Sequence, residues 1–306
     1  ALSSGTALDQ VSLPHLSASL ELYQASALVH DDIIDKADER RGMPTPHRTL
    51  AHHHASSSWI GSSTDFGRHA AILVGDFLFS AATAAADEQA LTLREDCARA
   101  FARRFADMHA EVALGQYLDI TAEQTPLDPQ RTDALSTSDS LEVALHKSAH
   151  YSVVHPAILG AICGASTFDG VAELLAVLET ILTPWGLAFQ LRDDDLGVFG
   201  DPTVTGKPAG DDLREGKRTA LLALTWEASS PAERRALTDV LGVVEASAEQ
   251  IATATDIVAR NGRAAHEAEI ARLVADGDAA LEASTFDEDA RAMLRELCSI
   301  LTARRA

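Results

Sequence analysis

Acidic residues gather at two places where a long apolar stretch ends, and these are the positions best suited to chemistry. The first group is Asp31-Asp32-Ile33-Ile34-Asp35. Asp31 and Asp35 are four residues apart, so in a helix their carboxylates project from one face. Neighbouring carboxylates repel, and a hard cation such as Mg²⁺ relieves that repulsion while it shares carboxylates with substrate phosphates. Taken alone, this group fits a solvated helix end equally well.

The second acidic group makes the metal interpretation stronger. Asp193-Asp194-Asp195 again ends a long apolar stretch, and the following residues 200–219 are rich in Gly, Lys and Asp, with Lys207 and Lys217 among them. Glycine lets a backbone approach an anion, and lysine supplies a mobile positive charge. Two such acidic helix ends facing one cavity would form a site for a metal-bound diphosphate.

Two arginines follow the first acidic group at a distance that a short loop could fold back over the aspartates. Arg40 and Arg41 carry guanidinium groups, which match phosphate oxygens with paired hydrogen bonds. A surface salt-bridge patch with the upstream acids is the alternative interpretation.

The elements that must position these groups are helices. Period-two alternation is not sustained anywhere, so a sheet is not expected. Apolar helical patterns cover residues 16–35, 70–86, 91–120, 141–155 and 171–199. Glycine- and proline-rich breakers separate them at residues 42–46, 125–129 and 200–216.

The later helices carry start and stop signals. Ser230-Pro231-Ala232-Glu233 predicts an N-cap with a capping box, and Asn261-Gly262 predicts a C-cap. Residues 284–305 are predicted as the last helix. Since no repeat or low-complexity linker is visible, we predict one all-α domain over residues 1–306.

Composition excludes several classes of protein. With 46 acidic against 25 basic residues the net charge is −21, which disfavours a nucleic-acid binder. No apolar run approaches the ~18 residues of a membrane span, and no signal peptide is visible. Cys97, Cys163 and Cys298 are widely spaced, as is typical of buried thiols in a reducing cytoplasm. The histidines at 52–54 point about 100° apart on a helix and do not converge on one ion.

The ordered set of motifs resembles that of the polyprenyl (isoprenyl) diphosphate synthases. The stretch from Asp31 to His47 is similar to the family's first aspartate-rich motif. Further similar motifs follow in the family's order: Gly75-Asp76, Gly115-Gln116-x-x-Asp119, Lys147-Ser148-Ala149-x-Tyr151 and the stretch from Phe189 to Thr219. The similarity covers nearly the whole chain and looks most like bacterial geranylgeranyl or longer-chain synthases.

This resemblance implies an activity and an architecture. It implies a single-domain helical bundle of the isoprenoid synthase type with a central active-site cavity, in a homodimer. Together with the cysteine usage, we expect a cytoplasmic protein. The implied reaction lengthens an allylic diphosphate with isopentenyl diphosphate, with three Mg²⁺ ions bridging the allylic diphosphate to both motifs. Nucleic acid and an integral membrane segment are not expected.

The resemblance also implies roles for particular residues. The implied metal ligands are Asp31, Asp35 and Asp193, supported by Asp32 and Asp194. Arg40, Lys147 and Lys207 would bind the allylic diphosphate, Arg41 the diphosphate of isopentenyl diphosphate, and Lys217 would belong to the same lining. Gln190 and Ser148 would present oxygen dipoles to the allylic cation.

Two features depart from the family pattern. Gly197 stands where the second motif commonly has a third aspartate, and Asp195 should point to a different face of the helix. Compensation by Asp201 or Asp212 through water is a hypothesis. The family's Gly-Gly-Lys-x-x-Arg-Pro element, which binds isopentenyl diphosphate, has no counterpart before Asp31. We expect it in an upstream segment outside this sequence; the alternative is that this protein does not bind the second substrate in the family's usual way.

The product length depends on the helix that carries Asp31. At 1.5 Å per residue, Ala27 lies about 6 Å and Tyr23 about 12 Å below Asp31, on approximately one side. In the family, bulky aromatic residues four or five positions before the first aspartate stop growth at C15, and here those positions hold Ala27 and Ser26. We therefore predict a C20 product, with C25 as the alternative. Tyr23 is either a deeper floor or a core tyrosine.

Two other functions remain as alternatives. A class I terpene cyclase shares the first aspartate motif, but its second motif carries a hydroxyl residue and a glutamate that residues 193–201 lack at that spacing. A non-catalytic subunit of a synthase heterodimer tends to lose aspartate motifs, which are largely kept here.

Overall fold

The computed structural model describes residues 13–201, 210–243 and 245–302, and this part of the chain is almost entirely helical. The chain divides at Ala102 and Arg103, inside helix α4 (Glu95–Gln124), into two compact units. We call the part up to Ala102 the N-terminal unit and the part from Arg103 the C-terminal unit. The predicted all-α fold class is confirmed.

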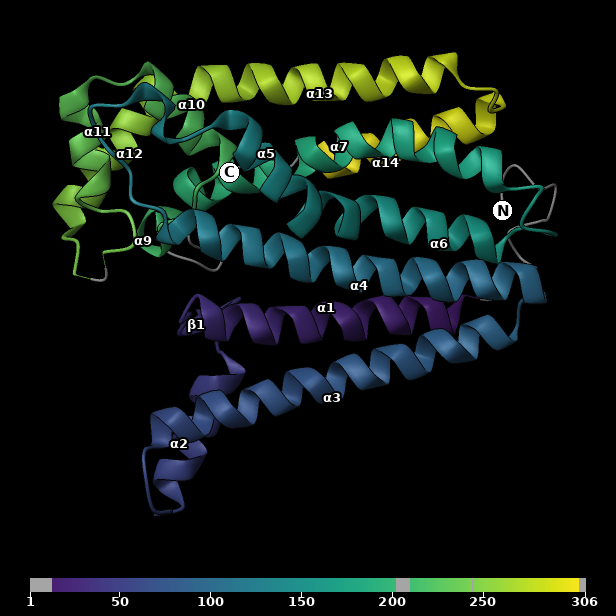
Figure 1. Cartoon of the computed structure of the whole chain (residues 1–306), viewed down its shortest axis with the longest axis horizontal. Helices are drawn as coiled ribbons and strands as arrows, with labels where there is room; N and C mark the ends of the chain where they lie inside the picture. The colour runs from purple at the N-terminus through teal and green to yellow at the C-terminus, as the bar shows by residue number, and fades with distance from the viewer. Residues whose placement is uncertain (1–12, 202–209, 244, 303–306) are drawn as a thin grey trace. The chain divides into compact units, whose positions relative to one another are not determined.

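The N-terminal unit is built on a pair of long helices. Its elements are α1 (Pro14–Ile34), β1 (Glu39–Arg40), β2 (Met43–Pro44), α2 (Pro46–Ser56) and α3 (Ser63–Leu91). Helix α1 runs beside α3, and α2 packs near the start of α3 (Figure 1). Gly75 permits the close approach of α1, because a Cβ there would lie 2.3 Å from the Nε2 of His30.

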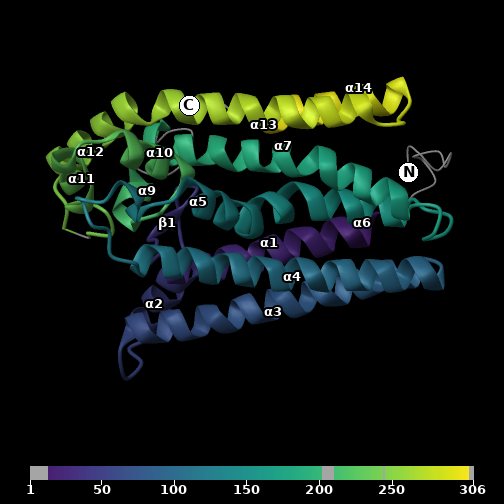
Figure 2. The ribbon, with the colours of Figure 1, turned by 45° about the horizontal axis from the view of Figure 1, so that its top comes forward.

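The C-terminal unit surrounds helix α7 (Ala172–Phe199). The other elements are η2 (Thr132–Ala134), α5 (Thr137–Ala144), η3 (Leu145–Val154), α6 (His155–Cys163), α9 (Asp211–Glu215), α10 (Ala220–Ala228), α11 (Pro231–Thr238), α12 (Ala248–Asn261), α13 (Arg263–Ala283) and α14 (Glu288–Thr302). Helix α13 runs along α7 in both views (Figures 1 and 2). The α7 side chains Ile181, Leu182 and Trp185 are fully buried.

A second part of this core forms around α10. Trp226 is fully buried among side chains of α10 and α12, and its Nε1 donates to the carbonyl oxygen of Arg131 at 2.9 Å. Arg234 of α11 donates through Nε to the carbonyl oxygen of Trp226 at 2.8 Å. The indole is thus buried with its polar group satisfied, as a stable core requires.

The structure divides the helix predicted over residues 141–155. Helix α5 ends at Ala144, and η3 is a π-helix in which the N–H of His155 bonds to the carbonyl of His150, five residues back. Pro156 follows directly. A proline has no N–H and its ring clashes with the carbonyl of the preceding turn in an α-helix, so a wider turn before it relieves the conflict.

The predicted ends of the later helices are largely confirmed. The capping box of Ser230 and Glu233 is present, and α12 ends at Asn261 with Gly262 as its C-cap. The last helix begins at Glu288 instead of Ser284, since the Oγ of Ser284 donates to the carbonyl of Leu281 at the end of α13. Asp287 instead accepts the N–H of Ala290, which satisfies the first turn of α14.

Two described helices, α3 and α7, are long and apolar enough to cross a membrane by length and composition. Core helices of water-soluble proteins have the same property. Helix α7 also carries three aspartates in its last turns, which a bilayer interior disfavours. These two helices are therefore weak evidence for a membrane span.

Glycine at position 277 sets the distance between α13 and α7. A Cβ on Gly277 would lie 2.4 Å from the Nε1 of Trp185, whereas a Cβ on Gly160 of α6 would meet nothing within 4 Å. We expect Gly277→Ala to lower the free energy of unfolding by about 1–3 kcal/mol through overpacking. The matched change Gly160→Ala should leave stability unchanged or raise it by up to about 1 kcal/mol. Urea unfolding of both variants tests this, and equal midpoints would contradict the packing argument.

Candidate functional site

The first aspartate motif occupies the last turn of α1 in the N-terminal unit and is bound by Arg40. The Nε of Arg40 donates to Asp32 Oδ1 at 2.7 Å, and an Nη donates to Asp31 Oδ2 at 3.1 Å. Asp32 is buried, whereas Asp31 and Asp35 are half-buried. Burial lowers the pKa of Arg40, but Asp32 and Asp31 outweigh this effect and the pKa is raised overall. The guanidinium therefore stays charged beside the carboxylates.

A tight hairpin returns Arg40 to the aspartates. Arg40 pairs with Met43 across β1 and β2, so Arg41 and Gly42 form the two-residue loop. Their φ angles are 55° and 71°, the left-handed values that a type I′ turn requires at both positions. This geometry separates the two arginines: Arg40 faces the carboxylates, and Arg41 is exposed at the tip of the hairpin.

The three aspartates of the second motif have different environments at the end of α7. Asp193 is exposed, whereas Asp194 and Asp195 are buried. The Nε2 of Gln190 donates to Asp194 Oδ1 at 2.8 Å. Asp195 accepts two hydrogen bonds from Arg263 at 3.0 and 3.1 Å, so its carboxylate faces α13. Asp195 therefore does not take the place of a third metal ligand in this motif.

Negative charge is crowded around Asp194. Burial raises the pKa of Asp194 well above its usual value, and the neighbouring carboxylate of Asp212 raises it further, against the hydrogen bond from Gln190. Lys217 lies close by, with its Nζ 3.9 Å from Asp212 Oδ1 and 2.6 Å from Glu215 Oε2. A divalent cation would relieve the repulsion between these crowded carboxylates, and their oxygens are suitable ligands for it.

Asp212 fills the space that a side chain at position 197 would occupy. A Cβ on Gly197 would lie 2.0 Å from Asp212 Oδ2. The carboxylate of Asp212, on α9, therefore lies where an aspartate at position 197 would place its side chain. Of the two candidates named from the sequence, Asp212 has this geometry.

Lys147 lies in η3 and pairs with a residue of α4. Its Nζ is 2.5 Å from Asp119 Oδ2, and both side chains are largely buried. The backbones of α4 and η3 come close at this point, because a Cβ on Gly115 would lie 2.3 Å from the backbone nitrogen of Lys147. The sequence motif containing Gly115 and Asp119 was recognised, but it did not indicate that Asp119 is the partner of Lys147.

The remaining predicted site residues are placed as follows. Ser148 is half-buried in η3, next to Lys147. Lys207 lies outside the described residues. The structure thus groups Asp31, Asp32 and Arg40 in the N-terminal unit, and Gln190, Asp194, Asp212 and Lys217 in the C-terminal unit.

The three residues predicted to set product length do not share one environment. The buried Ser26 donates through Oγ to the carbonyl of Gly75 at 2.8 Å. Tyr23 is also buried, with its ring 6.3 Å from that of Phe79 on α3. Both side chains therefore pack on α3, while the side chain of Ala27 is half-buried.

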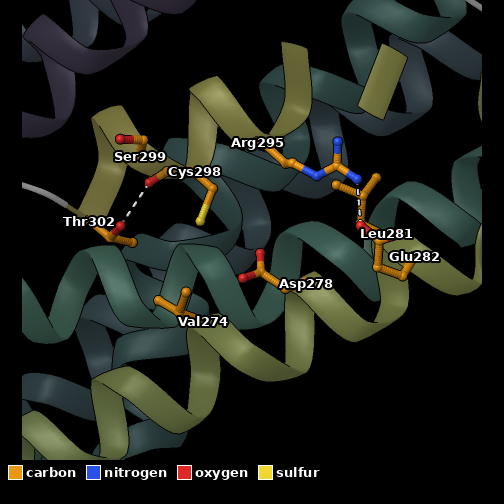
Figure 3. Close-up of a pocket in the computed structure, with 8 residues that line it drawn as sticks. All are labelled: Val274, Asp278, Leu281, Glu282, Arg295, Cys298, Ser299 and Thr302. Atoms are coloured by element: carbon orange, nitrogen blue, oxygen red, sulfur yellow. Dashed lines mark hydrogen bonds and ion pairs between the residues drawn. The ribbon is translucent and has the colours of Figure 1, made fainter. Parts of the chain in front are cut away.

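A pocket of about 350 Å³ lies between α13 and α14, and none of the residues that line it is a predicted site residue (Figure 3). The thiol of Cys298 and the carboxylate of Asp278 point into this space. Burial, and secondarily Asp278, raise the pKa of Cys298 to about 11. A thiol protonated to that degree is a poor nucleophile at neutral pH, so this pocket does not suggest covalent catalysis.

Comparisons with known proteins identify the family. The model of the family described as Polyprenyl synthetase matches residues 2–258. The geranylfarnesyl diphosphate synthase of Aeropyrum pernix is 33% identical over 249 residues, which are 81% of this chain and 68% of that protein. The geranylgeranyl diphosphate synthase of Mycobacterium tuberculosis is 32% identical over 289 residues, which are 92% of this chain and 72% of that protein.

A solved structure is similar over almost the whole chain. It is the geranylgeranyl pyrophosphate synthase of Corynebacterium glutamicum complexed with isoprenyl diphosphate and magnesium, with a TM-score of 0.87 and 37% identity. The match covers 99% of this chain and 83% of that one. Fold, ordered motifs and family model agree, and the chain belongs to the polyprenyl synthetase family.

Proposed function

We propose that the protein is a trans-prenyltransferase that condenses isopentenyl diphosphate with an allylic diphosphate to give geranylgeranyl diphosphate, with the C25 product as the alternative. The observation that carries this proposal is the pair of carboxylate clusters, each beside a basic side chain, in a chain of this family. Arg40 accompanies the first cluster and Lys217 the second.

The carboxylates fit a divalent cation. We propose that three ions are bound together with diphosphate. Their ligands in this proposal are Asp31 and Asp35 from the first motif, supported by Asp32, and Asp193 from the second motif, supported by Asp194. All these donors are carboxylate oxygens, the ligand type that Mg²⁺ prefers. Bound Mg²⁺ stabilises the negative charge that develops on a departing diphosphate.

The basic side chains bind the substrates in this proposal. Arg40, Lys147, Lys207 and Lys217 hold oxygens of the allylic diphosphate. Arg41, exposed at the tip of its hairpin, binds the diphosphate of isopentenyl diphosphate. Arginine suits this role because its planar fork binds two phosphate oxygens at once.

The reaction exchanges one carbon–oxygen bond for one carbon–carbon bond. The allylic C–O bond breaks, diphosphate leaves with the electron pair, and the alkene of isopentenyl diphosphate attacks the allylic cation. A proton is then lost, to the departed diphosphate in our proposal. Gln190 donates its amide N–H to Asp194, which leaves its carbonyl oxygen as the negative end of a dipole for the cation.

The function is tested by supplying purified protein with Mg²⁺, isopentenyl diphosphate and a C5, C10 or C15 allylic diphosphate. We expect longer prenyl diphosphates, no turnover with a chelator, and a rate lowered by about 100-fold or more in Asp31→Asn, because a charged ligand is lost. Asp87→Asn, an exposed change on α3, should keep the wild-type rate. Hydrocarbon or alcohol products would instead indicate a cyclase, and no turnover with any primer would indicate a non-catalytic subunit.

The role of Asp212 is tested by moving its carboxylate. We expect Gly197→Asp to lower both the melting temperature and the turnover rate, because two carboxylates would compete for one space. Asp212→Gly alone should also reduce the rate. The double variant, with aspartate at 197 and glycine at 212, should recover at least about 10-fold of the lost rate. Additive losses in the double variant would show that the two positions do not substitute for each other.

Product length is tested at Ala27, on the same helix as Asp31. We expect Ala27→Phe to shift the product from C20 towards C15, because an aromatic ring would obstruct the growing chain about 6 Å below Asp31. Ala18→Phe, at an exposed position of α1, is the matched control and should leave the product unchanged. Chromatography of the dephosphorylated products measures both. A C20 product from Ala27→Phe would refute this placement of the chain.

We also propose a cytoplasmic homodimer that uses the exposed face of α3. Ile72, Leu73 and Phe77 are 42%, 68% and 71% exposed in the single chain. A contiguous apolar patch on a helix indicates a surface that another protein covers. A second copy of this chain is the occupant that the family resemblance supports.

A further inference from the structure

A carboxylate of α4 is surrounded by three histidines in the C-terminal unit. Glu111 Oε1 accepts hydrogen bonds from His146 Nδ1 at 2.7 Å and His150 Nδ1 at 2.5 Å. Its other oxygen, Oε2, accepts from His155 Nε2 at 2.6 Å. Burial raises the pKa of Glu111, but the hydrogen bonds from the histidines outweigh burial and hold it well below its usual range. The group is therefore an ionised carboxylate with imidazoles on both oxygens.

The π-helix brings the histidines to one face. In an α-helix, with about 100° between residues, His146 and His155 would point in opposite directions. In a π-helix, with roughly 4.4 residues per turn, spacings of four and five residues both return to the same side. His146, His150 and His155 have these spacings, and the neighbouring rings in this series have centroids 6.0 Å apart. π-Helical turns occur frequently at functional sites.

The cluster is largely buried but remains partly exposed to solvent on one side. The side chains of Glu111, His146 and His150 are 19%, 26% and 22% exposed, whereas that of His155 is 3% exposed. Glu142 adds a second carboxylate, 3.6 Å from the Nε2 of His146. The guanidinium of Arg104 and the imidazole of His109 also face His155. An ion could enter from solvent on the side of His146 and His150.

We propose that Glu111, His146 and His150 form a binding site for a divalent transition-metal ion such as Zn²⁺, separate from the aspartate motifs, with His155 positioning the carboxylate. One ligand atom from each of the three residues lies within 4.8 Å of the others. Zinc bonds of 2.0–2.2 Å place ligand atoms roughly 3.3 Å apart in a tetrahedron, so small side-chain shifts suffice. Two histidines and a glutamate are a known zinc donor set that leaves a fourth position for water.

The ligand atoms of this site differ in kind from those of the aspartate motifs. Imidazole nitrogens favour zinc and its transition-metal neighbours, while Mg²⁺ favours oxygen donors. The hydrogen bond from His155 to Oε2 would orient the carboxylate, as outer partners of metal ligands commonly do. Binding through the two Nδ1 atoms would move their protons to Nε2 of the same rings or to solvent. The bound ion would join α4 to the helix that carries Lys147.

The test measures metal binding without any substrate, so its result is independent of the proposed prenyl transfer. Metal-free protein in excess Mg²⁺, which occupies oxygen-donor sites, is titrated with Zn²⁺ against a chromophoric chelator. We expect one Zn²⁺ per chain, and an affinity at least about 100-fold weaker in His146→Gln/His150→Gln, which lacks two of three protein ligands. The matched control His52→Gln/His53→Gln removes two exposed histidines of α2 and should bind like the wild type.

Single variants keep the test decisive if the double variant does not fold. His150→Gln and Glu111→Gln should each weaken Zn²⁺ binding by about 10-fold or more while circular dichroism shows the wild-type helix content. Co²⁺ in place of Zn²⁺ should give a visible absorption band in the wild type that both variants lack. Equal Zn²⁺ affinity in the wild type, these variants and the control would overturn the proposal. The cluster would then only be a set of hydrogen bonds from three histidines to Glu111.

Discussion

Carboxylates at the ends of apolar helices need positive partners, and the described structure is organised around meeting that need. Arg40 holds Asp31 and Asp32, Lys147 holds Asp119, and Arg263 holds Asp195. A buried charge without such a partner costs several kcal/mol, so each pairing restricts where its helix can lie. In the second aspartate motif Arg263 binds Asp195, whereas the buried Asp194 lies close to the carboxylate of Asp212, with Lys217 nearby. This crowding of carboxylates makes the motif a candidate for a cation supplied from solution.

The overall fold could be predicted from local signals. The apolar patterns at residues 16–35 and 171–199 correspond closely to α1 and α7, and the capping box at Ser230 marks a true helix start. Such features depend on residues a few positions apart, which a sequence displays directly. The family motifs were recognisable for the same reason, and the family assignment is confirmed.

The contacts that build the site could not be predicted in the same way. Asp119 and Lys147, or Glu111 and His155, come together only after α4 and η3 have packed. The π-helix was predicted as an ordinary helix. The spacing of apolar residues over one or two turns is too similar in an α-helix and a π-helix to tell them apart. Pro156 was noticed as a break in an apolar run, but its effect on the preceding turn depends on hydrogen bonds that the sequence does not show. The placement of Tyr23 and Ser26 against α3 likewise depends on Gly75, a residue distant in the chain.

The position of Asp212 beside Gly197 has a consequence for how related chains vary. The space holds one carboxylate, attached either to α7 or to α9. Substitutions at the two positions should therefore be correlated in evolution: a small residue at one should accompany an acid at the other. A search pattern that requires aspartate at the third place of the second motif would pass over such chains, although the charge is present and only its point of attachment to the backbone has moved.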